Sequence, residues 1–146
     1  MNELAVMRAA VVAVLETLDL GIELRLFGED RPMPPDRLFG DFWLIGGTGF
    51  VVDEEAPQPI VRRVGLLQLT VWQPQGLRGP VKRIVTTFSR GFAGRAMCDL
   101  LGRSYQFKKK GDVTQIARGT HVATVARIGF SRDEPIKAAG DLHTTW

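Results

Sequence analysis

The stretch Ile60–Trp72, with the sequence IVRRVGLLQLTVW, decides the fold that this chain is expected to adopt. Apolar residues dominate it, and a strand that is covered on both faces shows this density rather than strict alternation. The segment Pro74-Gln75-Gly76 follows directly and is typical of a sharp turn. We therefore predict that Ile60–Trp72 is the longest strand and lies at the centre of a sheet.

Two elements are expected before this strand, at the start of the chain. Apolar residues recur at helical spacing and predict an amphipathic helix that ends at Gly21: Leu4, Met7, Val11, Val14, Leu15 and Leu18. Apolar and charged residues then alternate over Ile22–Phe27, which predicts a short strand with one solvent-facing side.

The segment between these elements and the central strand begins with three prolines, Pro32, Pro34 and Pro35, which predict an extended connection. Two strand pieces follow, Phe39–Ile45 and Phe50–Asp53. Because Gly46, Gly47 and Gly49 separate them, they form either a hairpin or one bulged strand.

After the central strand, an apolar stripe with a period of 3.6 predicts a second helix within Gly79–Leu101. Strands are expected at Tyr105–Lys109, Asp112–Ala117 and Val122–Phe130, with the first two joined by a turn at Lys110-Gly111. This order predicts an α+β fold in which two helices pack on one face of a mostly antiparallel sheet of four to five strands. We expect one domain over residues 1–134 and a C-terminal tail over residues 135–146.

The composition excludes several classes of protein. The chain has 146 residues, of which 45% are hydrophobic and 24% charged, as in ordinary globular domains. Its longest apolar run, Ala9–Leu15, is far shorter than the roughly 20 residues of a membrane-spanning helix. The single cysteine, Cys98, excludes an internal disulfide, and with only two histidines the sequence offers no zinc site of usual spacing. We expect no metal and no cofactor.

Charge is distributed unevenly along the chain. Residues 1–61 carry eleven acidic residues against four basic ones, whereas residues 62–132 carry fourteen basic residues against two acidic ones. Such polarity indicates either a surface for nucleic acid or two oppositely charged faces that meet in self-assembly. The alternative is that the two halves interleave in the fold and their charges mix on the surface.

Motifs for catalysis are weak in this sequence. Gly47-Thr48-Gly49 begins like a dinucleotide-binding loop, but its third glycine is missing and an acidic run follows in place of a helix. A triad of Ser89 or Ser104 with His121 and an aspartate could be assembled in space, although a packed or surface histidine is the simpler interpretation. We predict that the protein is not an enzyme.

The candidate functional residues are charged residues that occur in clusters along the sequence. Lys108, Lys109 and Lys110 are expected at a hairpin tip, where they would attract phosphates without sequence specificity or keep an edge strand soluble. Arg62 and Arg63 begin the central strand, and the acidic run Asp53-Glu54-Glu55 precedes it. The predicted interface or DNA-facing residues are therefore Lys108, Lys109, Lys110, Arg62, Arg63, Asp53, Glu54 and Glu55. The acidic run could also hold a divalent cation, but solvated turn carboxylates are the simpler interpretation.

The segment Leu67-Gln68-Leu69-Thr70-Val71-Trp72, running into Pro74-Gln75-Gly76 and then a helix, resembles the central strand and second helix of tail terminator proteins of long-tailed bacteriophages. The closing stretch Val125–Phe130 is similar to a last strand in that family. A prophage, tailocin or gene transfer agent relative would show the same likeness. The resemblance implies a ring, usually of six subunits, that caps the tail tube, stops its polymerisation and offers a surface to the head.

The same resemblance implies the partners and the location: other copies of the chain, the tail tube protein, a head-joining or neck protein, and DNA passing through the channel. The protein would be made in the host cytoplasm and reside at the head-proximal end of the virion tail. Another head-tail joining protein and a small basic nucleic-acid-binding module remain alternatives. In the ring, the acidic first part of one copy would meet the basic later part of the next. The connection from Gly28 to Phe42 and the three lysines would project toward a neighbour, the tube or DNA.

Overall fold

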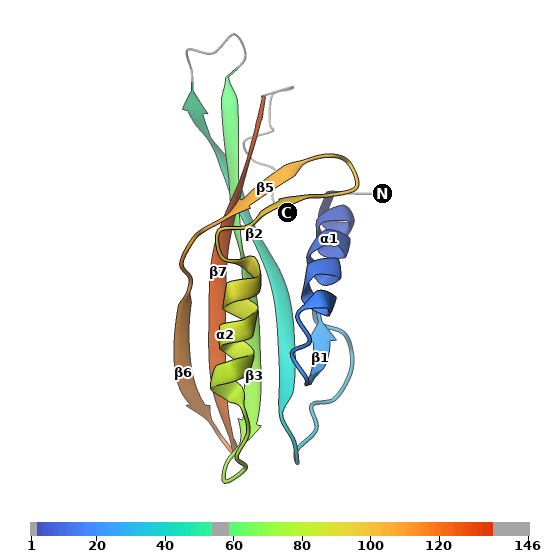
Figure 1. The fold of residues 1–146 in the computed structure, drawn as a ribbon, viewed down its shortest axis with the longest axis vertical. Coiled ribbons are helices and arrows are strands. Elements are labelled where there is room, and N and C mark those ends of the chain that lie inside the picture. Colours follow the sequence, from blue (N-terminus) through green and yellow to red (C-terminus); the bar gives the residue numbers. More distant parts are fainter. Residues whose placement is uncertain (1–2, 54–58, 136–146) are drawn as a thin grey trace.

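A computed structural model describes residues 3–53 and 59–135 of the chain (Figure 1). Its elements follow in the order α1 (Glu3–Thr17), β1 (Glu23–Leu26), β2 (Phe39–Asp53), β3 (Ile60–Pro74), α2 (Val81–Phe92), β4 (Ala96–Cys98), β5 (Ser104–Phe107), β6 (Asp112–Arg118) and β7 (His121–Pro135). Glu54, Glu55 and the part of the predicted tail beyond Pro135 lie outside the described residues.

Three long antiparallel strands, β2, β3 and β7, form the middle of the sheet, and each has 15 residues. β3 lies between the other two, as the apolar density of Ile60–Trp72 predicted. Leu67, Leu69 and Val71 of β3 are fully buried on the face that carries the helices. On the other face Val64 is exposed and Leu66 and Trp72 are half-buried, so that face is covered only in part.

Shorter strands extend the sheet on both sides. β1 pairs with residues 39–42 of β2 in the parallel direction. On the far side of β7, β6 pairs with residues 121–127, β5 pairs with residues 130–131, and β4 pairs with β5. Figure 1 shows β4 and β5 crossing the upper end of the two helices, so the sheet curls around the core.

The predicted fold class was wrong in its sheet. Within the described residues, the sheet has seven strands and is mixed, in place of four to five mostly antiparallel ones, and it dominates the fold. The pieces Phe39–Ile45 and Phe50–Asp53 are one strand, β2, whose pairing with β3 shifts register between Gly46 and Gly49. A Cβ on Gly49 would overlap the side chain of Val61, so the bulge depends on a missing side chain.

The second helix is shorter than predicted, because the chain leaves helical geometry after Phe92. Gly94 adopts a positive φ of 68°, a conformation that favours glycine, and its N–H donates to the carbonyl of Lys108. β4 then takes up three residues that the sequence had placed in the helix. The buried residues of α2 follow the predicted stripe: Val81, Ile84, Val85, Phe88 and Phe92.

A chain of aromatic contacts holds the helical layer against the sheet. It runs from β2 through α2 to β5 and β7, with centroid separations between neighbouring rings of 5.3 to 6.0 Å: Phe42, Phe88, Phe92, Phe107, Phe130 and Tyr105. All six side chains are among the most fully buried of the protein. Burial of these six rings adds apolar stabilisation to that of the aliphatic core.

The segment Lys108–Gly111 is not the tip of a hairpin, contrary to the prediction. β5 and β6 do not turn back on each other, because both run antiparallel to β7 on the same side of it. The four residues therefore form a bulge between two collinear strands, opposite residues 128 and 129 of β7. The turn in this region lies instead at Gly119-Thr120, which connects β6 to β7.

Gly111 makes this bulge possible, and its replacement by alanine is expected to destabilise the fold by about 1–3 kcal/mol. A Cβ at this position would overlap the backbone carbonyl oxygen of Arg127, which cannot rotate away. The measurement is urea denaturation followed by circular dichroism. Lys110→Ala, which removes only an exposed side chain, is the control and should shift the midpoint little. Equal midpoints for the two variants would contradict the bulge.

Candidate functional site

The three predicted lysines are exposed at the bulge, but they face different surfaces. The Lys108 side chain lies across Gly129 on the face of the sheet away from the helices. It lies so close that a Cβ added to Gly129 would be 3.3 Å from the Cδ of Lys108. Lys109 borders Gly94 and faces α2, while Lys110 lines hollows on both sides. The cluster is therefore shared between two surfaces.

Arg62 and Arg63 point to opposite faces of β3, and both are held by ion pairs. Arg62 donates to both carboxylate oxygens of Asp133, at 2.8 and 3.0 Å. These hydrogen bonds raise the pKa of Arg62 and lower the pKa of Asp133. Arg63 is almost fully buried and donates to Glu134, which also pairs with Arg132 at 2.9 Å. Arg63 is thus a structural residue of the sheet rather than part of an exposed surface.

The acidic run Asp53-Glu54-Glu55 is only partly described. Asp53 ends β2 and lies opposite Ile60 of β3. Glu54 and Glu55 lie outside the described residues, so the predicted role of this run stays a prediction. Within the described ranges 3–53 and 59–135, no group of three or more acidic, histidine or cysteine side chains is placed to hold a metal ion.

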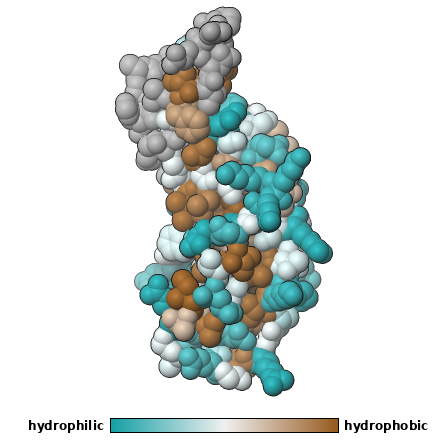
Figure 2. Space-filling model, turned by 90° about the vertical axis from the view of Figure 1, so that its left-hand side faces the viewer, coloured by the Kyte–Doolittle hydropathy of each residue, from teal (hydrophilic) through white to brown (hydrophobic). Residues whose placement is uncertain are grey.

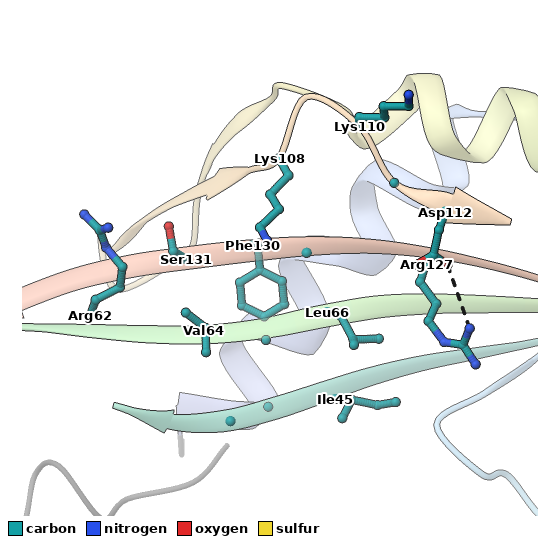
Figure 3. Close-up of a pocket in the computed structure, with 15 residues that line it drawn as sticks. Ile45, Arg62, Val64, Leu66, Lys108, Lys110, Asp112, Arg127, Phe130 and Ser131 are labelled. Atoms are coloured by element: carbon teal, nitrogen blue, oxygen red, sulfur yellow. Dashed lines mark ion pairs between the residues drawn. The ribbon is translucent and has the colours of Figure 1, made fainter. Parts of the chain in front are cut away.

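The face of the sheet away from the helices, here called the open face, carries a groove of about 820 Å³. Ile45, Val64 and Leu66 supply apolar side chains along its floor, and Arg62, Lys108 and Arg127 stand around it (Figure 3). Arg127 is held by a hydrogen bond to Gln68 at 2.9 Å and lies 3.8 Å from Asp112. The groove is therefore apolar inside and charged at its rim, where Arg62, Lys108, Lys110 and Arg127 are basic and Asp112 is acidic.

A second, smaller groove of about 320 Å³ separates α2 from the bulge. Arg90, Lys109 and Lys110 bring three cations to it, and the half-buried Thr86 and Ser89 bring hydroxyls. This combination of positive charge and hydrogen-bond donors suits phosphate or carboxylate groups.

The fold separates the charges of the two halves of the chain. α1, β1 and the connection to β2 form one flank, here called the acidic flank, whose exposed carboxylates are Glu16, Asp19, Glu23, Glu29, Asp30 and Asp36. β5, β6 and the neighbouring surface of α2 form the opposite, basic flank, with exposed Lys82, Arg90, Arg95, Lys108, Lys109, Lys110 and Arg118. β3 and β7 lie between them, so exposed carboxylates predominate on one flank and exposed cations on the other. Some cations also lie on the acidic flank: Arg31 and Arg37 are exposed there, and Arg37 pairs with Glu23 at 3.0 Å.

The expected projection of the Gly28–Phe42 connection is only partly right. Its last four residues belong to β2, and Phe39 and Phe42 are fully buried. Arg25 of β1 pairs with the buried Asp41, which also accepts a hydrogen bond from the Trp72 indole at 2.9 Å. The exposed part of the connection lies on the acidic flank, with Glu29, Asp30 and Asp36.

The loop between β4 and β5 is a feature that the sequence reasoning missed. Leu100 and Leu101 are 79% and 59% exposed, the largest values among the bulky apolar side chains of the described residues. Asp99 beside them is buried and accepts hydrogen bonds from Arg103, Tyr105 and the backbone N–H of Leu101. An aspartate followed by two leucines and Gly102 is a turn signal that could have been noticed.

Apolar side chains also emerge along the side of the molecule that carries β6. Figure 2 shows brown apolar patches there between teal hydrophilic side chains. Val113 and Ile116 of β6 are 52% and 41% exposed, and every residue of that strand is exposed. β6 is an edge strand of the sheet in the described part of the chain, and such an edge can accept another strand.

The ring and hydrogen-bond contacts of His121 in the described residues are with Trp72 and Thr120, not with a serine or an aspartate of the predicted triad. Its ring packs edge-on against Trp72 at 6.5 Å between centroids, and its Nδ1 lies 3.0 Å from the Thr120 hydroxyl. The hydroxyl oxygen of Ser104, one of the candidate nucleophiles, lies 3.4 Å from the sulfur of Cys98 instead.

Among the described helices, none has the length and apolar character needed to cross a membrane.

Comparison with known proteins identifies the fold and no family. No family model matches the sequence, and no curated protein matches it. One solved structure, of a protein whose name gives no function, superposes with a TM-score of 0.70. It covers 94% of this chain and 100% of its own, at 10% sequence identity. This similarity shows that the architecture described above occurs in another protein.

Proposed function

We propose that this protein is a tail terminator, a subunit that closes into a ring on the last ring of a phage tail tube. The ring stops polymerisation of the tube and provides the surface for head attachment. The partners are other copies of this chain, the tail tube protein and a head-joining protein. The observation that supports this proposal is that exposed carboxylates predominate on one flank of the sheet and exposed cations on the opposite flank.

Opposite charge on opposite flanks suits a contact between unlike patches. Such a contact repeats around an axis and closes into a ring, whereas one self-complementary patch stops at a dimer. A tube subunit must offer bonding surfaces at its top and bottom, and a terminator lacks one of them. The acidic flank of one copy then meets the basic flank of the next, with attraction that salt weakens.

Charge reversal tests the contact between flanks. Lys109→Glu with Lys110→Glu is expected to weaken self-association, and so is Glu16→Lys with Asp19→Lys, because each leaves like charges facing each other. All four changes in one chain should restore association, as measured by sedimentation at low and high salt. Arg78→Glu, in the exposed loop before α2, is the control. Unchanged association of both double variants would remove the flanks from the interface.

Electron microscopy of tails assembled without this protein tests the function itself. Overlong tubes are the expected result, because nothing then stops polymerisation. Tubes of normal length with detached heads would indicate a head-tail joining protein instead. Virus particles that are indifferent to the deletion would contradict both.

The groove between α2 and the bulge favours a second candidate, a basic module that binds nucleic acid. Arg90, Lys109 and Lys110 could neutralise phosphates there without contacting bases. Retention of duplex DNA by the purified chain, falling steeply with salt, would favour this function. Co-purification with a tail tube protein would favour the terminator.

A further inference from the structure

β6 offers an unpaired edge of the sheet along its whole length. It pairs with β7 on one side, and no strand within residues 3–53 and 59–135 pairs with its other side. All seven of its residues are exposed. An edge of this kind presents backbone N–H and C=O groups to which a further strand can bond.

The turn between β6 and β7 determines which backbone groups of β6 point outward. Gly119-Thr120 is a two-residue turn, and Gly119 has a positive φ of 60°, as in turns that close tight hairpins. Such a turn is closed by a hydrogen bond between its flanking residues, here Arg118 and His121. Hydrogen-bonded positions alternate along an antiparallel pair. The outward N–H and C=O groups therefore belong to every second residue of β6: Val113, Gln115 and Ala117.

Other edges of the sheet carry features that oppose strand addition, and β6 lacks them. At β1, the Leu24 carbonyl accepts from the Arg31 guanidinium, and the Leu26 N–H donates to the Glu29 carboxylate at 2.6 Å. β2 shifts register twice beyond its pairing with β1, and β4 has only three residues. β6 pairs with β7 without a register shift and has no proline, and its five central residues are uncharged. It is therefore suited to pairing with another strand.

Two apolar side chains of β6 lie on opposite faces of this edge. Val113 and Ile116 are 52% and 41% exposed, and they face opposite sides because side chains alternate along a strand. Figure 2 shows apolar side chains between hydrophilic ones on this side of the molecule. A strand added to β6 covers part of both side chains, so apolar burial adds to the backbone hydrogen bonds.

Cations without partners lie at both ends of the edge. Arg90, Lys109 and Lys110 line a groove together with Val113, and Arg118 ends the strand. None of these four side chains, here called the edge cations, has a hydrogen bond or an ion pair with another described residue. Asp112 is the one carboxylate of β6, and it lies 3.8 Å from Arg127.

This excess of positive charge selects the kind of strand that can be added. A second copy of β6 would bring the same edge cations to the contact, and like charges across a strand pair are destabilising. A strand that carries carboxylates would instead pair with cations that have no partner in the described part of the chain.

We propose that β6 binds an extended acidic segment of a partner protein as an additional strand of the sheet. The backbone of the segment bonds to the outward groups of Val113, Gln115 and Ala117. Its central apolar or β-branched residues contact Val113 and Ile116, and its carboxylates meet the edge cations. The proposal goes beyond the ring and does not rest on it, because strand addition needs only the backbone of one subunit.

Binding of a short peptide tests the proposal. The probe is the amidated peptide DEVTVED with fluorescein at its amino end, and KRVTVRK with the same label is the control of reversed charge. The acidic peptide is expected to bind the full-length chain, as measured by fluorescence anisotropy, and the basic peptide is not. Binding should also slow hydrogen exchange of the Val113, Gln115 and Ala117 amides. No binding of the acidic peptide up to millimolar protein, or unchanged exchange at these three amides, overturns the proposal.

A proline in β6 separates strand addition from attraction between charges. Gln115→Pro removes one outward N–H, and an edge strand tolerates proline where the N–H faces solvent. Affinity for the acidic peptide should fall by about 10-fold or more, because a central hydrogen bond is lost and the ring obstructs pairing. Gln115→Ala is the matched control: it loses the same side chain, whose amide donates to Thr124 at 3.2 Å, but keeps the N–H. Equal affinity of the two variants would overturn strand addition.

Lys109→Ala with Lys110→Ala supplies a measurement that does not depend on the folding of the proline variant. It changes only exposed side chains, so the midpoint of thermal unfolding should stay close to that of the natural chain. Affinity for the acidic peptide should fall, and the loss should shrink at high salt. Unchanged affinity would overturn the role of the edge cations.

Self-association distinguishes an acidic partner from a contact between copies. Gln115→Pro keeps every charge of the basic flank, so the self-association proposed above should be unchanged in sedimentation. Self-association that is lost in Gln115→Pro and kept in Gln115→Ala would assign the edge of β6 to the interface between copies and overturn the acidic partner.

Discussion

Replacing Phe92 by alanine is expected to lower the free energy of unfolding by about 3–5 kcal/mol. Phe92 is fully buried at the end of α2, and its ring contacts Phe88 and Phe107 at 5.4 and 5.3 Å between centroids. Its loss would interrupt the aromatic chain between the helical layer and the curled part of the sheet. The cavity has rigid walls, because β5 and β7 are held by backbone pairing.

Urea denaturation followed by tryptophan fluorescence and circular dichroism measures this effect. Phe50→Ala is the matched control: Phe50 is 47% exposed in β2, so its removal should change stability by less than about 0.5 kcal/mol. Coincident transitions from the two probes would justify a two-state treatment. Similar stability losses in the two variants would contradict the placement of Phe92 in the core.

Replacing Asp99 by alanine is expected to cost about 3–5 kcal/mol, because it removes the buried carboxylate to which both Arg103 and the Tyr105 hydroxyl donate. Asp112→Ala is the control, since the Asp112 side chain is 68% exposed and its ion pair with Arg127 spans 3.8 Å. Surface pairs of this kind contribute about 0–1 kcal/mol. Comparable losses in the two variants would show that the Asp99 network does not stabilise the fold.

The same network predicts how stability depends on pH. Burial raises the pKa of Asp99, but hydrogen bonds from Tyr105, Arg103 and Leu101 outweigh it and hold this pKa below its usual value of 3.8. A carboxyl group with a lowered pKa in the folded state stabilises the protein above its unfolded pKa. That contribution is lost as the pH falls below 3.8 through the folded-state pKa.

Thermal unfolding between neutral pH and about pH 2 measures this dependence. Asp133 also has a lowered pKa, through its hydrogen bonds from Arg62, so the natural chain carries contributions from both groups. Asp99→Asn removes one of them, and its stability should fall less steeply with decreasing pH than that of the natural chain. Parallel curves for the two chains would contradict the lowered pKa of Asp99.

The local sequence pattern was sufficient to predict those elements in which buried apolar residues recur at regular spacing. The apolar positions of α1, the alternation in β1 and the density of β3 each appear within one short window of sequence. Each of these elements was predicted to within about four residues of its observed bounds. Where a glycine changes the pattern, the prediction was less definite or wrong. Gly46, Gly47 and Gly49 left a hairpin and one bulged strand both open, of which the bulged strand is observed, and the predicted second helix ran past Gly94.

The candidate site depends on contacts between residues that are far apart in the sequence, which no short stretch of sequence can show. Arg62 and Arg63 are neighbours in sequence, yet adjacent residues of a strand face opposite sides, so one pairs with Asp133 on the surface and the other with Glu134 in the interior. The buried role of Asp99 likewise follows from Arg103 and Tyr105, whose approach depends on how the β4–β5 hairpin folds back.

By itself the sequence determined most of the helical and extended segments, β4 being the exception, and that positive charge is concentrated in the second half of the chain. Periodicity and composition are local properties, so they can be seen without the fold. Only the tertiary structure decided that β5 and β6 share one side of β7, which turned an expected hairpin tip into a bulge. It also decided that most exposed carboxylates lie on one flank and most exposed cations on the opposite flank. Strand order and register depend on pairing between distant residues, and many such pairings are compatible with one local pattern.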